Sequence, residues 1–202
     1  MKQAEGRAHR KLPGKAAGTI LRKRSGTREM EPKKEETQVS IYEMRQAEET
    51  QIPEFIQVLQ ERIDWMESRG MKQWNDEEYL DFYSEEYFRA QARAGHLFFL
   101  IKEGRAAGVT ALLEEDDRWE DGSREYFYVH HLASRTGIPG AGSAFLGLIE
   151  DYARKQGKRG IRLDCQLGNE PLNCFYERNG YVTVGEPFTA GGYTGIRKVL
   201  EF

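Results

Sequence analysis

The sequence contains few cysteines, few prolines and no long apolar run. Two cysteines among 202 residues, Cys165 and Cys174, cannot form a disulfide framework, and no His/Cys cluster has the spacing of a zinc site. No apolar stretch approaches the roughly 20 residues that span a bilayer, so we expect no transmembrane helix and no membrane partner. These absences favour a cytoplasmic protein that binds no metal.

The overall composition is typical of a folded globular domain, and the N-terminal segment differs from it by being strongly basic. Apolar residues make up 39% and charged residues 31%, which excludes a wholly disordered chain. Residues 1–28 hold nine Lys or Arg and one acidic residue, so the net charge of −3 leaves −11 on residues 29–202. We predict residues 1–36 as a disordered basic tail, or as an extension ahead of Met30; a nucleic-acid-binding arm is the alternative.

Periodic patterns over residues 37–202 predict an α/β domain. Val39, Ile41 and Tyr42 indicate a first strand, and an apolar residue every third or fourth position after Pro53 indicates a helix. The expected elements are strand 37–44, helices 53–70 and 76–94, strands 97–101, 106–113 and 126–133, a helix after residue 142, strand 161–165, helix 171–177, and strands 181–185 and 193–200. This order implies a mixed, mostly antiparallel central sheet flanked by helices, with strands 126–133 and 161–165 as a parallel pair.

A glycine-rich turn precedes the helix that follows strand 126–133. It reads Gly137-Ile138-Pro139-Gly140-Ala141-Gly142. Backbone N–H groups at the start of a helix are free to bind an anion, and glycines allow close approach of the backbone. The spacing does not fit an ATP-binding P-loop. The turn by itself is compatible with phosphate binding or with a plain helix start.

Three motifs in order resemble the GNAT superfamily of acetyl-CoA-dependent N-acetyltransferases, over residues 37–202. They are His130-His131-Leu132-Ala133-Ser134, the glycine turn, and Asn169 followed by Tyr176-Glu177-Arg178-Asn179-Gly180-Tyr181. Gly137 stands where the family usually has Gln or Arg, Ser134 replaces Val, and Tyr181 replaces Phe. The segment Arg162-Leu163-Asp164-Cys165 resembles a bacterial small-molecule branch of the superfamily. The resemblance implies a GNAT-like acyl-CoA N-acyltransferase fold and acetyl-CoA as co-substrate.

The resemblance also implies roles for individual residues. Tyr176 matches the tyrosine that protonates the departing thiolate, and the backbone N–H of Leu132 or Ala133 is the expected oxyanion donor. Asn169 matches a cofactor-contacting asparagine, although a helix cap explains it equally well. The residues expected to bind the cofactor are Leu132, Ala133, Ser134, Gly137, Gly140, Ala141, Gly142, Ser143 and Asn169.

The base that deprotonates the acceptor is expected on strand 126–133. Strand alternation puts Tyr126, Tyr128, His130 and Leu132 on one face, and Phe127, Val129, His131 and Ala133 on the other. The resemblance implies that His130 faces the acceptor, and an imidazole there is suited to proton abstraction near neutral pH. An orienting role for His130 and abstraction through water remain alternatives. Trp74 and Tyr128 are the expected acceptor contacts, and we expect His131 to be structural on the opposite face.

Two further groups of residues have simpler interpretations. We interpret Cys165 and Cys174 as small core residues rather than nucleophiles. The acidic run between residues 114 and 121 lacks the glycine and terminal glutamate of an EF-hand, so we expect an exposed hairpin loop.

The sequence therefore predicts an enzyme that moves acetyl from acetyl-CoA to a primary amine. We expect direct attack in a ternary complex, on a small or peptide acceptor that the sequence does not identify. The acidic body favours a cationic amine. The alternatives are a non-catalytic acyl-CoA-binding regulatory module and a nucleic-acid-associated protein acting through the tail, although we expect no nucleic-acid partner. Whether the chain forms a homodimer stays open.

Overall fold

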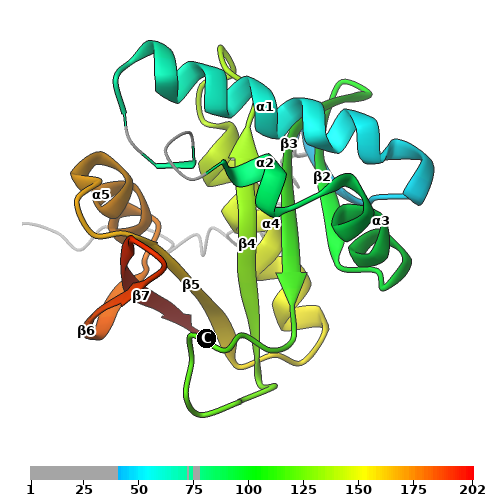
Figure 1. Ribbon diagram of the computed structural model, residues 1–202. Helices are drawn as coiled ribbons and strands as arrows, with labels where there is room; N and C mark the ends of the chain where they lie inside the picture. Colours follow the sequence, from blue (N-terminus) through cyan, green and yellow to red (C-terminus); the bar gives the residue numbers. More distant parts are fainter. Residues whose placement is uncertain (1–40, 72, 75–77) are drawn as a thin grey trace, which may run out of the picture. The chain divides into compact units, whose positions relative to one another are not determined.

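The computed structural model describes residues 41–202, apart from 72 and 75–77. The predicted tail and the first residues of strand 37–44 lie outside this range. In chain order the elements are β1 (Tyr42–Gln46), η1 (Glu49–Gln51), α1 (Ile52–Ser68), α2 (Tyr79–Phe82), α3 (Glu85–Arg93), β2 (Leu97–Lys102), β3 (Arg105–Leu113), β4 (Tyr126–Ser134), α4 (Ala141–Lys155), β5 (Gly160–Gln166), α5 (Glu170–Arg178), β6 (Val182–Ala190) and β7 (Tyr193–Glu201) (Figure 1). No helix in the described part of the chain has the length and apolarity of a membrane span.

The described strands form one seven-stranded sheet in the order β1-β2-β3-β4-β5-β7-β6. Only β4 and β5 are parallel, and all the other neighbours are antiparallel. The connection between β4 and β5 crosses over through α4, as expected for a strand–helix–strand unit, and a second crossover through α5 joins β5 to β6 on the far side of β7. The predicted mixed, mostly antiparallel sheet is confirmed.

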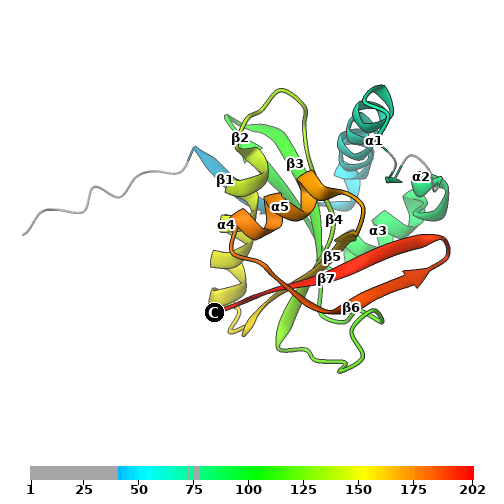
Figure 2. The ribbon, with the colours of Figure 1, turned by 90° about the vertical axis from the view of Figure 1, so that its left-hand side faces the viewer.

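Helices cover both faces of the sheet. α4 and α5 lie on one face, and α1, α2 and α3 lie on the other (Figure 2). Phe145 and Ile149 of α4 are completely buried against the first face, and Phe55 and Phe88 are buried against the second. Each such side chain stabilises the fold by about 1.5–3 kcal/mol through burial. The two cores hold the strands between them in a fixed position.

The predicted helix 76–94 is two helices rather than one. α2 ends at Phe82 and α3 begins at Glu85. The interruption follows from Ser84, whose Oγ accepts a hydrogen bond from the backbone N–H of Tyr87 at 3.3 Å and caps α3. The start predicted at residue 76 lies outside the described residues.

β4 contains a bulge that the predicted alternation did not include. Ala111 pairs with His130 and Val109 pairs with Ala133, so His131 and Leu132 together face the single residue Thr110. His131 has a φ of 55°, and the Thr110 hydroxyl donates to the His130 carbonyl at 3.1 Å. Beyond the bulge the two faces exchange. Leu132 therefore packs in the α4 core and Ala133 in the α1 core, the reverse of the prediction.

β4 and β5 pair over only a short stretch. The ladder joins Tyr126, Phe127 and Tyr128 to residues 160–162, and it does not continue to the ends of the strands. Figure 1 shows the two strands diverging beyond this point. The sheet is therefore open between the second half of β4 and the second half of β5.

Candidate active site

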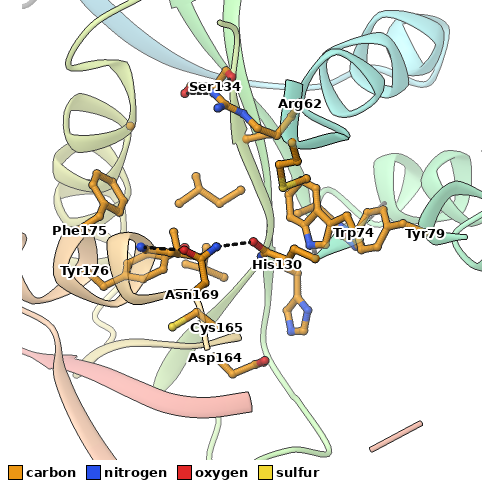
Figure 3. A pocket seen from close by; sticks show the side chains of 18 of the residues that line it. Arg62, Trp74, Tyr79, His130, Ser134, Asp164, Cys165, Asn169, Phe175 and Tyr176 are labelled. Carbon is orange, nitrogen blue, oxygen red and sulfur yellow. Dashed lines mark hydrogen bonds between the residues drawn. The ribbon is translucent and has the colours of Figure 1, made fainter. Parts of the chain in front are cut away.

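A pocket of about 960 Å³ lies at the opening between β4 and β5. Its walls come from both strands, from the start of α4, from α5, from the α1–α2 region and from the β6–β7 turn. Figure 3 shows Phe175 and Tyr176 on one side of it and Trp74 and Tyr79 on the other. Of the predicted site residues, those that line it are Trp74, His130, Leu132, Ala133, Ser134, Gly140, Ala141, Gly142, Ser143, Asn169 and Tyr176.

The start of α4 presents unpaired amides to this pocket. Gly140 precedes the helix with a φ of 78° and has no side chain to cap it. The N–H groups of Gly142 and Ser143 make no hydrogen bond to any described residue. Together with the positive end of the helix dipole, they form a site suited to an anion such as a phosphate. Gly137 lies outside this pocket and lines a smaller one of about 220 Å³ beside it.

α1 holds the chain between β4 and the glycine turn. Glu61 accepts from the Thr136 N–H and hydroxyl at 2.7 and 2.8 Å, and from Arg135 at 2.7 Å. Burial would raise the pKa of Glu61, but these bonds from Thr136 and Arg135 lower it overall. Arg62 donates to the carbonyl and the hydroxyl of Ser134. The approach to α4 is therefore fixed by two adjacent side chains of α1.

Tyr176 of α5 is buried at the wall of the pocket. Its hydroxyl makes no hydrogen bond to any described residue, and burial, with Cys165 and Tyr181 nearby, raises its pKa far above the usual value. The phenol therefore keeps its proton and is a potential proton donor. Burial also raises the pKa of Cys165 to about 12, so this thiol is not a nucleophile. Cys174 is exposed, which corrects its predicted place in the core.

His130 forms a dyad with an aspartate of the acidic loop. Its Nε2 lies 2.8 Å from Oδ2 of Asp116, whose side chain is only 6% exposed. Burial would raise the pKa of Asp116, but the hydrogen bond and charge of His130 and the N–H of Arg118 lower it overall. Asp116 thus stays ionised beside the imidazole. The acidic loop is not simply an exposed hairpin loop, since Trp119 is buried as well.

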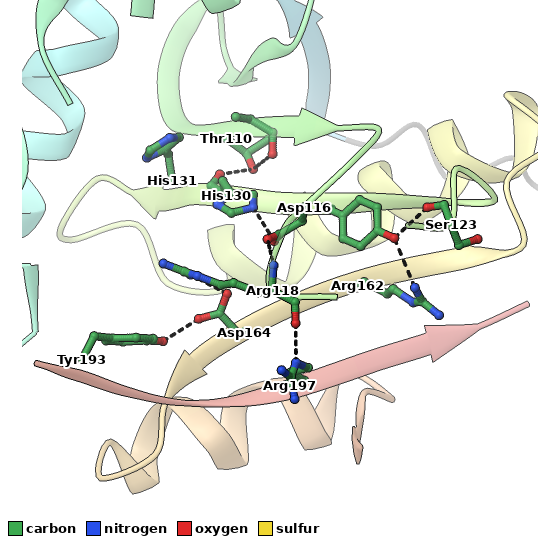
Figure 4. Close-up of polar contacts among 12 residues, drawn as sticks. Thr110, Asp116, Arg118, Ser123, His130, His131, Arg162, Asp164, Tyr193 and Arg197 are labelled. Atoms are coloured by element: carbon green, nitrogen blue, oxygen red, sulfur yellow. Dashed lines mark hydrogen bonds and ion pairs between the residues drawn. The ribbon is translucent and has the colours of Figure 1, made fainter. Parts of the chain in front are cut away.

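A second buried carboxylate lies near the dyad (Figure 4). Asp164 of β5 is 5% exposed and accepts from Arg118 at 2.6 Å and from the Tyr193 hydroxyl at 2.7 Å. Burial would lower the pKa of Arg118, but Asp164 raises it. Asp116, Arg118, Asp164 and Tyr193 are site residues that no sequence motif predicted. The alternation of charged and apolar residues in Arg162-Leu163-Asp164-Cys165 was the available signal.

His131 does not lie on the face opposite His130. The bulge turns it into a cage of aromatic side chains on α2 and α3, where Tyr79 hydrogen-bonds its Nδ1 and Tyr87 its Nε2. Burial, and then the charges of His130 and Arg118, lower its pKa well below the usual value. His131 is therefore a neutral residue that anchors these helices to β4.

Three other predicted residues have distinct environments. Tyr128 is completely buried, donates to the Ser123 carbonyl at 2.6 Å and does not line the pocket, so it offers no surface to an acceptor. Trp74 lines the pocket and stacks on Tyr79 with ring centroids 4.7 Å apart. Asn169 caps α5 by accepting from the Leu172 N–H at 3.1 Å, and it also donates to Gln73 at 2.9 Å.

Comparison with known proteins identifies the family of this chain. The profile of the acetyltransferase (GNAT) family matches residues 57–181. The uncharacterized N-acetyltransferase YesJ of Bacillus subtilis (strain 168) is 31% identical over 145 residues, which cover 68% of this chain and 78% of the relative.

Solved structures share the fold. A GNAT-family acetyltransferase from Listeria monocytogenes superposes with a TM-score of 0.64 at 23% identity, over 79% of this chain and 95% of that chain. The PaiA N-acetyltransferase of Thermoplasma acidophilum, solved with coenzyme A, gives 0.58 at 17% identity, over 77% and 97%. The family profile and the relative show that this chain belongs to the GNAT acetyltransferase family, and the shared fold is consistent with this assignment.

Proposed function

We propose that this chain transfers an acetyl group from acetyl-CoA to a primary amine by direct attack within a ternary complex. The observation that carries the proposal is the pocket, because one cavity joins the free amides of α4, the Tyr176 hydroxyl and the His130–Asp116 dyad. The bacterial small-molecule branch suggested by β5 stays a prediction.

Two sets of backbone N–H groups are suited to bind acetyl-CoA, one at the start of α4 and one in the second half of β4. The N–H groups of Gly142 and Ser143 would hold its phosphates, as at other helix starts that bind anions. When bound, acetyl-CoA supplies the acetyl thioester. The N–H of Arg135 donates to Ala107 on β3 at 2.8 Å, and alternation from this point turns the N–H of Leu132, rather than that of Ala133, toward the opening. Leu132 is therefore our choice for the oxyanion donor.

The dyad and the buried tyrosine move two different protons. Asp116 is ionised, so Nε2 of His130 carries the proton of their hydrogen bond and Nδ1 is left with a lone pair. Nδ1 makes no hydrogen bond to any described residue, and it would accept the proton of the acceptor ammonium. The Tyr176 hydroxyl, held protonated by burial, would donate to the departing sulfur.

An amine screen with a free-thiol readout tests the proposal. Purified full-length chain is incubated with acetyl-CoA and a library of primary amines, and thiol release above the amine-free rate is confirmed by the mass of the N-acetyl product. Isothermal titration with acetyl-CoA is run in parallel. Binding of acetyl-CoA without transfer to any amine would replace the proposal with the acyl-CoA-binding regulatory module. Absence of binding would remove both.

A further inference from the structure

The end of the pocket beyond His130 has aromatic walls. We call this the acceptor end and define it by Trp74, Tyr79, Tyr83, Arg118, Asp164 and Tyr193, all of which line the pocket. Tyr79 is the centre of the wall, with ring centroids 4.7 Å from Trp74 and 4.9 Å from Tyr83. Arg118 and Asp164 line the same pocket as this aromatic wall. A ligand here would meet aromatic side chains and one ion pair.

The ion pair leaves the acceptor end without a free cation among the described residues that line it. The guanidinium of Arg118 is 2.6 Å from Asp164, and it also lies over the ring of Tyr193 at 5.3 Å. Arg62, the other described arginine of the pocket, is engaged by Ser134 near the glycine turn. The charges of Arg118 and Asp164 cancel, and Asp116, which lies outside the acceptor end but 2.8 Å from His130, adds −1 when His130 is neutral. This balance favours a cation and opposes a second anion.

We propose that the acceptor is a primary amine on an apolar, ring-sized body, with no carboxylate beside the amine, and that Asp164 enforces the exclusion. The inference rests on the proposed function and names the substrate class of its site. An ammonium gains from the −1 balance and from ring faces, and an apolar body gains from burial against Trp74 and Tyr83. A carboxylate would be buried near Asp164 without a cation to neutralise it.

The reaction balances with the groups already described. The N–C bond to the acetyl carbon forms and the C–S bond of the thioester breaks. The ammonium loses one proton to Nδ1 of His130 before attack, and the sulfur leaves with the proton of Tyr176. The nitrogen loses its second proton as the tetrahedral intermediate collapses; this proton restores the Tyr176 hydroxyl, and His130 releases its own to solvent. This acceptor class is narrower than the cationic amine favoured by the charge of −11 on residues 29–202, because total charge acts at long range whereas the pocket wall acts in contact.

A matched amine series tests the acceptor class on the wild-type chain. 2-Phenylethylamine, phenylalaninamide and phenylalanine share one body and differ only at the carbon beside the amine; ethylamine lacks the ring, and putrescine adds a second charge. We expect kcat/KM for 2-phenylethylamine to exceed that for phenylalanine on the order of 100-fold, with phenylalaninamide nearer to the former. Ethylamine and putrescine should each be at least about 10-fold poorer than 2-phenylethylamine.

Asp164→Asn and Tyr193→Phe identify the residue that enforces the exclusion. Asp164→Asn removes the charge that occupies Arg118, so the preference for 2-phenylethylamine over phenylalanine should fall at least about 10-fold. Tyr193→Phe keeps the ring and the charge of Asp164, so it should keep that preference. Unchanged acetyl-CoA affinity and a cooperative thermal unfolding transition show that each variant is folded.

The outcomes separate this inference from the proposed function. Equal use of phenylalanine and 2-phenylethylamine, or a preference for putrescine, overturns the inference and leaves the acetyltransferase proposal standing. A preference that survives Asp164→Asn removes the role of Asp164. If no amine in the series or in the wider screen is acetylated, the proposed function itself fails, and the inference fails with it.

Discussion

Tyr176 and His130 act on different protons, and their neighbours determine how each responds to substitution. Tyr176→Phe removes one hydroxyl from a buried ring and keeps its packing against Phe175 and Tyr181. We expect kcat to fall by about 10²–10⁴-fold, the usual contribution of a general acid, with acetyl-CoA affinity unchanged. Stopped-flow thiol release and isothermal titration measure the two quantities. A loss below about threefold would remove Tyr176 as the acid.

His130→Ala should change the pH dependence of the reaction as well as its rate. Without the imidazole, transfer depends on amine that is already neutral, so activity should move toward higher pH. Asp116→Asn keeps a side chain of the same size beside Nε2 and removes its charge, so it should lower kcat/KM with little effect on acetyl-CoA binding. The pH profiles of kcat/KM for wild type and both variants make the comparison. Profiles of identical shape would favour abstraction through water.

The buried imidazole of His131 should make the stability of the fold depend on pH. Its folded-state pKa is well below the usual value, whereas the unfolded chain binds the proton near pH 6.5. Burial of the neutral ring therefore contributes fully to the free energy of unfolding above pH 6.5, and this contribution is lost as the pH falls below that value. The loss approaches about 1.4 kcal/mol per pH unit for one proton. Urea unfolding at pH 7 and pH 5 should show a smaller difference for His131→Asn than for wild type.

At the scale of single elements, the start of α4 provides the anion site. Gly142→Glu places a carboxylate at the free amides, and its Cβ would lie 3.1 Å from Phe175. We expect this variant to lose the rise in melting temperature that acetyl-CoA produces. Gly147→Glu is the matched control, because it adds the same charge to the same helix where a Cβ meets nothing within 4 Å. Equal thermal shifts in both variants would place the anion elsewhere.

The order and bounds of the helices and strands were easier to predict from the sequence than the orientation of their side chains. Local patterns gave the order and most of the bounds, since periodicity and glycine stops are local signals. The bulge at His131 was hidden, because an inserted residue changes pairing with β3 without breaking the apolar pattern of β4. The Ser84 break in helix 76–94 had a local signal, a serine followed by two glutamates, that helix periodicity outweighed.

The site was predictable where a motif carried it and hidden where the tertiary fold assembled it. Tyr176, His130 and the turn at Gly140 follow from motifs within short segments. Asp116 and Asp164 come from a loop and a strand that only the assembled tertiary fold brings beside His130 and Arg118. The spacing of residues in a single sequence does not predict these two contacts. For the same reason Tyr128, on the predicted face, is covered by other residues and misses the pocket.

At the scale of the whole molecule, the described residues that line the pocket run from Arg62 to Tyr193, well after the basic tail in the sequence. Deleting residues 1–29 should therefore leave the melting temperature, acetyl-CoA affinity and kcat unchanged. Circular dichroism, titration and the thiol assay on the shortened chain measure these. Loss of solubility or affinity would move the predicted domain boundary. Salt-sensitive DNA or RNA binding that disappears with the deletion would support the nucleic-acid alternative.

The short ladder between β4 and β5 divides the strand pairing of the sheet into two groups. Strands β1 to β4 pair among themselves, β5 pairs with β7 and β7 with β6, and three residue pairs join the two groups. A chain cut at the exposed Gly157, between α4 and β5, yields one fragment with His130 and the anion site and another with Asp164 and Tyr176. Neither fragment holds a whole reaction centre, so acetyl transfer would report their reassembly, and the two halves could serve as a complementation sensor when fused to interacting proteins.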